Sequence, residues 1–226
     1  MNESEGGTVN EPEGGAGRPG AGGGASRGGL QGGEDRGKAM AASLVRTTRA
    51  FGLSEDGISL LATAHALAMQ PRVRSLTQRH PLFLHPGHTA LILLRDAKVR
   101  DASVLAAAAL AESRRMDLRV APGEAPSELR ELLEAVPTAQ DPRRVEKLVT
   151  APPEVRLIAM AEHLDHVRHA HLLPEVERDP PTLEGWLREV LEIWGPLAER
   201  THLRLWGRFR HWAKATERKL RRRGSG

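Results

Sequence analysis

The densest group of chemically active side chains in this sequence lies between residues 162 and 171. On a helix, four of them fall on one stripe at spacings i, i+3, i+4 and i+7: Glu162, Asp165, His166 and His169. Two carboxylates and two imidazoles at these separations offer the oxygen and nitrogen ligands that divalent metal ions accept. The alternative is a solvated polar face on which the acidic and imidazole groups pair with one another.

A second stretch, residues 79–88, places three histidines beside two prolines: His80, His85 and His88. The prolines predict a loop that enters a helix, where imidazoles face a cleft rather than the core. The alternative is an exposed loop that contains histidine without using it.

Helices must position both stretches, because helical periodicity dominates after the first 40 residues and no alternating strand pattern occurs. The predicted fold class is therefore all-α, a bundle of seven or eight helices with short connections. The expected ranges are 54–70, ended by Pro71; 87–97; 101–113, opened by Asp101; 126–136; 142–149; 152–164; 182–194, capped by Thr182; and 203–222.

Composition sets further bounds. The 226 residues include four tryptophans, three phenylalanines, no tyrosine and no cysteine, which predicts an aliphatic core and excludes disulfides and thiolate zinc sites. Fourteen of the 23 glycines lie in the first 37 residues, so residues 1–40 are expected to be a disordered tail. Neither a long uncharged apolar run nor a leader pattern occurs, which predicts a soluble, cytoplasmic protein.

Four short elements, in order over about residues 60–210, resemble the hydrolase domain of the RelA/SpoT homologue family, part of the HD superfamily. The family's His-Pro at a helix start is matched by His85-Pro86, and its helix ending in Leu-His-Asp by residues 101–112. Its Lys-Leu-Ala-Asp-Arg-x-His-Asn-Met-Arg is matched by residues 159–168, and its Pro-Leu-Ala-x-Arg by residues 196–200. Upstream, Ala64-His65 and Gln70-Pro71-Arg72 resemble its Ala-His and Gln-x-Arg, with altered spacing. The resemblance implies an HD-type domain over residues 43–213, followed by a basic helix end over residues 214–226.

In that family a manganese ion positions water to remove pyrophosphate from the 3′ position of guanosine tetra- or pentaphosphate. Carried over by resemblance, three ligand positions fall on His85, Glu112 and Glu162, and Ala111 stands where a further histidine is expected. His166, where the family has asparagine, adds metal-binding capacity, so the implied ion is Mn²⁺ or Mg²⁺. If one ion joins these groups, their carboxylate and imidazole heads should lie within roughly 6 Å of one another.

The acidic pair implicated in water activation in the family falls on Arg115 and Met116 here. Glu112 is then the sole catalytic candidate, and little hydrolytic activity is expected. Arg114 and Arg115 can instead pair with phosphate as guanidinium forks, or they are ordinary surface arginines at a helix end. The positions assigned to nucleotide contact are Arg72, Arg115, Asp165, Arg168 and His169.

The C-terminal segment, residues 200–226, contains ten Lys and Arg residues and a single acid. Apolar or small side chains recur along it at spacings of three and four: Trp206, Phe209, Ala213, Thr216 and Leu220. Such a basic amphipathic helix suits the phosphates of nucleic acid or an anionic membrane, or else its apolar stripe packs into the bundle.

The sequence therefore favours a degenerate RelA/SpoT-like protein that senses a guanine nucleotide or binds a protein partner. One alternative is an active manganese-dependent phosphohydrolase with rearranged metal ligands. The other is a basic adaptor for nucleic acid or membrane.

Overall fold

The protein is all-α over the residues that its computed structural model describes, 28–173 and 179–224, which confirms the predicted fold class. These residues form α1 (Gly28–Ala50), α2 (Glu55–Ser75), α3 (His85–Leu91), α4 (Ala102–Leu110), α5 (Arg130–Ala135), α6 (Arg144–Thr150), α7 (Pro153–Arg168), α9 (Pro180–Glu189), α10 (Gly195–Thr201) and α11 (Leu203–Gly224). Two π-helical turns, Ile92–Asp96 and Val190–Trp194, extend α3 and join α9 to α10. None of the described helices has the length and apolarity needed to cross a membrane.

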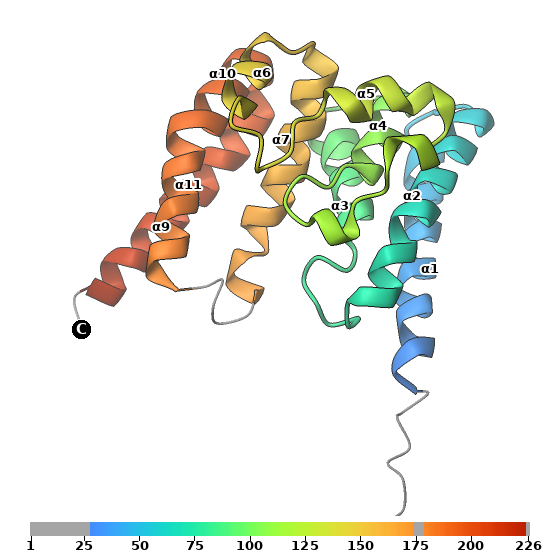
Figure 1. Ribbon diagram of the computed structural model, residues 1–226, viewed down its shortest axis with the longest axis horizontal. Coiled ribbons are helices and arrows are strands. Elements are labelled where there is room, and N and C mark those ends of the chain that lie inside the picture. Colours follow the sequence, from blue (N-terminus) through green and yellow to red (C-terminus); the bar gives the residue numbers. More distant parts are fainter. Residues whose placement is uncertain (1–27, 174–178, 225–226) are drawn as a thin grey trace, which may run out of the picture.

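The helices form two flanks around a central group (Figure 1). Helices α1 and α2 lie on one side, and α9, α10 and α11 lie on the other, with α3, α4 and α7 between them. Helix α4 packs against α2, α3 and α7, and every residue from Val104 to Leu110 is buried. Because four of these residues are alanines, the backbones of neighbouring helices can approach α4 closely.

Gly57, in the first turn of α2, lies at one such close approach. A Cβ atom added there would lie 2.8 Å from the Cβ of Ala102 and 3.3 Å from the Oγ of Ser54. Gly57→Ala is therefore expected to lower the free energy of unfolding by about 1–3 kcal/mol, because α2 and α4 must move apart. Urea unfolding measures this effect. Gly123→Ala is the control, since nothing lies within 4 Å of a Cβ at that position; equal losses in the two variants would contradict the packing argument.

The prediction that Pro71 ends the second helix was wrong, because α2 continues through Pro71 to Ser75. Proline removes one backbone hydrogen bond, but the following turn is held by a buried side chain. The guanidinium of Arg72 donates to the carbonyl oxygen of Ala68 at 3.0 Å, and the backbone N–H of Leu76 donates to the carbonyl of Arg72. The same guanidinium also donates to Glu112, 40 residues away in the chain, so a tertiary contact supports the turn that follows the proline.

The boundaries of two other helices can be compared with the predicted ones. Helix α9 begins at Pro180 with Asp179 as its N-cap, not at Thr182, in keeping with the preference of proline for the first turn. Helix α4 begins at the predicted cap, where the Asp101 carboxylate accepts from the N–H groups of Ser103 and Val104. It ends at Leu110, so Glu112 lies beyond its C-terminus.

The predicted tail over residues 1–40 lies partly outside the described residues. From Gly28 onward the chain is helical, which differs from the expectation for residues 28–40. Glycine disfavours helix, but α1 packs on α2 and buries Leu44 and Thr48. The tertiary contacts of its C-terminal half outweigh the unfavourable local propensity.

Helix α11 packs its apolar stripe into the bundle. Phe209, Ala213 and Thr216 are buried, and the ring of Phe209 lies 6.3 Å from that of Trp194. The apolar edge that a membrane would need is therefore largely used inside the protein. The exposed faces of α11 carry the cations: Arg204, Arg208, Arg210, Lys214, Arg218, Arg221, Arg222 and Arg223.

Candidate functional site

The four residues assigned to metal binding lie together in the centre of the bundle. His85 is the first residue of α3, Glu112 follows α4, and Glu162 and His166 are one turn apart on α7. All are buried, and single ligand atoms of His85, Glu112 and His166 lie within 4.8 Å of one another. Together with Arg72 they are called the buried cluster below.

Arg72 neutralises Glu112. Its Nη2 donates to the Oε2 of Glu112 at 2.6 Å, and both side chains are at most 2% exposed. The second oxygen of Glu112 accepts from the backbone N–H groups of Arg114 and Arg115 at 3.3 and 3.0 Å. The remaining guanidinium bonds of Arg72 reach backbone carbonyls, including that of Leu82. Arg72 is thus an internal counter-ion of Glu112.

Glu162 is likewise bound by groups of the protein. The hydroxyl of Ser113 donates to its Oε2 at 2.7 Å, and the N–H of Ser113 donates to its Oε1 at 3.3 Å. The Nε2 of His166 lies 3.0 Å from Glu162 Oε1 and 3.4 Å from Glu112 Oε1. Both distances are short enough for ion pairs between a protonated His166 and the two carboxylates.

The protonation of the buried cluster follows from these contacts. Burial favours the neutral imidazole of His166, but the two adjacent carboxylates outweigh it and raise its pKa to about 9. Burial likewise opposes ionisation of Glu112 and Glu162, yet their contacts with His166 leave both pKa values below the ordinary value. At neutral pH the cluster therefore contains two carboxylates balanced by an imidazolium and a guanidinium.

Asp165 connects the buried cluster to a surface pocket. Its Oδ2 is 2.7 Å from the Nδ1 of His85, and its Oδ1 is 3.4 and 3.3 Å from the Nδ1 atoms of His88 and His169. Burial alone would raise the pKa of Asp165, but its contacts with His169, His85 and His88 hold that pKa well below its usual range. Asp165 is thus a buried anion with histidines on two sides.

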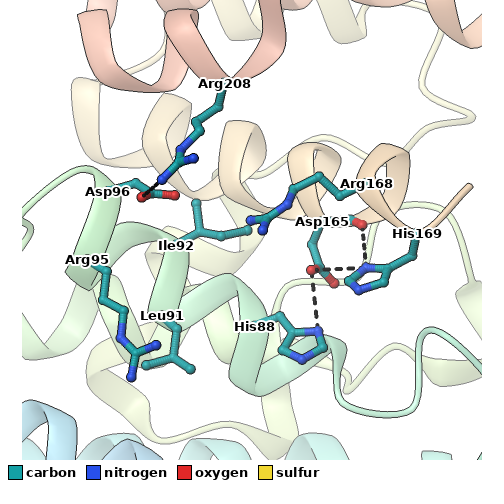
Figure 2. A pocket seen from close by; sticks show the side chains of 9 residues that line it. All are labelled: His88, Leu91, Ile92, Arg95, Asp96, Asp165, Arg168, His169 and Arg208. Atoms are coloured by element: carbon teal, nitrogen blue, oxygen red, sulfur yellow. Dashed lines mark hydrogen bonds and ion pairs between the residues drawn. The ribbon is translucent and has the colours of Figure 1, made fainter. Parts of the chain in front are cut away.

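The pocket has a volume of about 310 Å³ and lies between α3, its π-helical extension, the end of α7 and α11 (Figure 2). Three of the residues assigned to nucleotide contact line it, namely Asp165, Arg168 and His169. The other lining residues are His88, Leu91, Ile92, Arg95, Asp96 and Arg208. None of these six residues was assigned to a ligand from the sequence.

The two other predicted nucleotide contacts lie elsewhere. Arg72 belongs to the buried cluster, and Arg115 pairs with Asp117 at 3.0 Å outside the pocket. Arg114, considered as a phosphate fork, donates to Glu189 at 2.6 Å. The guanidinium of Arg114 is thus bound by a carboxylate of the protein itself rather than by a phosphate.

Comparisons of the chain with protein-family models, with curated proteins and with solved structures find no match. The RelA/SpoT resemblance therefore stays a hypothesis based on the short elements of the sequence that carry it.

Proposed function

We propose that this chain is a RelA/SpoT-like helical protein of HD type that binds an anionic nucleotide without hydrolysing it. The convergence of His85, Glu112 and Glu162 around His166 supports the relationship, because these three residues come from segments far apart in the sequence. The observation that carries the loss of hydrolysis is that both carboxylate oxygens of Glu112, which stands at a metal-ligand position of the family, already accept hydrogen bonds from Arg72 and from the backbone.

The residues of the buried cluster do not fit the manganese ion that the resemblance implies. Protein hydrogen bonds already reach both carboxylates, and the guanidinium of Arg72 remains next to any cation placed there. Ala111 stands at a position where the family has histidine, and alanine has no atom that can bind a metal ion. Because like charges repel strongly at low dielectric, the cluster favours its own cations over a metal ion.

The acidic side chains implicated in water activation in the family are also absent from the matching positions of this chain. The acidic pair of the family corresponds to Arg115 and Met116, and the Met116 side chain lies on the surface, 49% exposed. Positioned acids and bases contribute about 10²–10⁴ in rate, so their loss leaves little turnover. Binding is less affected, since it requires only a pocket of suitable size and charge.

The pocket beside Asp165 supports an anionic ligand. Arg95, Arg168 and Arg208 line it, against the acids Asp96 and Asp165. Arginine recognises phosphate through paired N–H donors, and the exposed side chain of Arg168 stands at the end of α7 beside His169. We therefore propose a guanine nucleotide with phosphate groups as the ligand.

The test combines a turnover assay with a binding assay. In manganese, the protein should release no pyrophosphate from guanosine tetraphosphate above the rate without protein. Calorimetry should show binding that Arg168→Ala weakens by about tenfold, the value of a charge-assisted hydrogen bond. Arg218→Ala, which changes an exposed arginine of α11 outside this pocket, is the matched control.

A second candidate function is favoured by one atom. The Nε2 of His85 is buried and has no hydrogen-bond partner among the residues that the structure describes, as expected of a metal ligand whose other nitrogen is held by a carboxylate. This supports an active phosphohydrolase with rearranged ligands. Manganese-dependent pyrophosphate release that His85→Ala abolishes would establish this candidate and refute the non-hydrolytic proposal.

A further inference from the structure

We propose that His88, Asp165 and His169, called the pocket triad, bind one first-row transition-metal ion in the wall of the pocket. These residues are separate from the ligand positions that the resemblance implies. One ligand atom of each lies within 4.8 Å of the other two. Figure 2 shows the three side chains turned toward one another, His88 from α3 and the other two from the end of α7.

The helices fix this arrangement. Asp165 and His169 are four residues apart, so their side chains lie on the same side of the final turn of α7. His88 is three residues after His85, and both face α7 through Asp165. The rings of His88 and His169 stack with centroids 5.1 Å apart, which leaves the carboxylate between two imidazoles.

Two of the potential ligands are also held by a group behind them. The Oδ2 of Asp165 is bound by His85 at 2.7 Å, which leaves Oδ1 directed to the pocket triad. The Nδ1 of His169 lies 2.8 Å from the carbonyl oxygen of Asp165 and 3.3 Å from Asp165 Oδ1, which fixes the orientation of this imidazole beside the carboxylate. Such supporting bonds orient ligands in metal sites and raise their basicity.

The distances also favour an ion over direct hydrogen bonds. Within the described part of the chain, the Nδ1 of His88 is buried without a hydrogen-bond partner, and it lies 3.4 Å from Asp165 Oδ1. This distance is long for a hydrogen bond to an ionised carboxylate. It matches the separation of about 3.4 Å between two ligands that bind one tetrahedral ion at about 2.1 Å each.

The donor set determines which ions suit the site. Two imidazoles and one carboxylate favour Zn²⁺, Fe²⁺ or Co²⁺ over Mg²⁺ and Ca²⁺, which prefer oxygen ligands. Three protein ligands leave a coordination position open toward the pocket, where water or an anionic group can bind.

The experiment is a titration of the full chain with Co²⁺ in a buffer without nucleotide. The visible absorption of bound Co²⁺ should saturate at one ion per chain with the intensity of a four- or five-coordinate site. His88→Ala and His169→Ala should each weaken binding by at least about 100-fold, because loss of an outer hydrogen bond to a ligand already costs about 10–100-fold. His211→Ala, on an exposed face of α11, should leave binding unchanged.

Three results would contradict metal binding by the pocket triad. The first is no Co²⁺ absorption at millimolar ion, and the second is Co²⁺ binding retained by the double variant His88→Ala/His169→Ala. The third is a loss of Co²⁺ affinity in His211→Ala equal to that in the triad variants. Circular dichroism of each variant excludes unfolding as the cause, and His88→Gln provides a second variant that keeps a polar side chain. Because no nucleotide is present, this result does not depend on the proposed function. The protein can bind Co²⁺ without binding nucleotide, and it can bind nucleotide without binding Co²⁺, so the two failures are distinguishable.

Discussion

Replacing Arg72 with methionine is expected to lower the free energy of unfolding by about 3–5 kcal/mol, a large effect for a single substitution. Methionine keeps much of the side-chain volume but removes the guanidinium. Glu112 then remains buried, 3% exposed, without its 2.6 Å partner. The energetic cost comes from the carboxylate left behind more than from the loss of an attraction.

Two further variants make this measurement specific. The double variant Arg72→Met/Glu112→Gln removes both charges and should regain part of the lost stability in a double-mutant cycle. Arg49 and Glu55 form a pair of similar length, 2.8 Å, but with side chains 57% and 72% exposed. Arg49→Met should therefore change the urea midpoint little. Equal losses in Arg72→Met and Arg49→Met would contradict an internal role for Arg72.

Stability is expected to fall as pH rises from about 6.5 to about 9. His166 has a pKa of about 9 in the folded protein against 6.5 for an unperturbed histidine, because Glu112 and Glu162 hold its proton despite burial. The stabilisation is complete below about pH 6.5, where the unfolded chain is also protonated, and it is lost as the pH rises through about 9. The shift corresponds to about 3 kcal/mol. Urea unfolding across this range measures the slope, which His166→Gln should remove.

At acidic pH, the slope of the free energy of unfolding against pH should have the opposite sign. Burial, assisted by the charge of Arg72, lowers the pKa of His65 to about 4. Between about pH 6.5 and 4 the unfolded chain therefore binds a proton that the folded protein does not, and stability falls as the pH falls. His65→Gln should reduce this slope without affecting the alkaline one. A stability profile that stays flat from about pH 6.5 to 9 would contradict the protonation assigned to His166.

Much of the site was accessible from the sequence. The stripe formed by Glu162, Asp165, His166 and His169 was predicted from helical spacing, and α7 places Asp165 and His166 on different sides of the same turn. His85 and Glu112 were assigned by resemblance, and the structure brings them to the same cluster. Local spacing predicted that these groups share one helix, but not that Glu162 and His166 face the buried cluster while Asp165 and His169 face the pocket.

The counter-ions could not be predicted in this way. Arg72 lies 40 residues before Glu112, and a buried arginine has no sequence signal that distinguishes it from an exposed one. Arg114 and Glu189 are 75 residues apart and meet only through the packing of the folded chain. The role of His88 likewise depends on α3 beginning at His85, two residues earlier than the periodicity predicted. These contacts are set by helix packing over long separations rather than by local pattern.

The most direct measurement of the central claim is the nitrogen NMR spectrum of His166 in uniformly labelled protein, recorded near pH 7 with and without Zn²⁺. If protein charges have replaced the metal ion of the buried cluster, His166 gives the signals of an imidazolium in both samples, and Zn²⁺ shifts only the resonances of His88 and His169. A neutral, metal-bound His166 nitrogen in the presence of Zn²⁺ would show that the buried cluster still accepts an ion, and would contradict the replacement of that ion by Arg72 and His166.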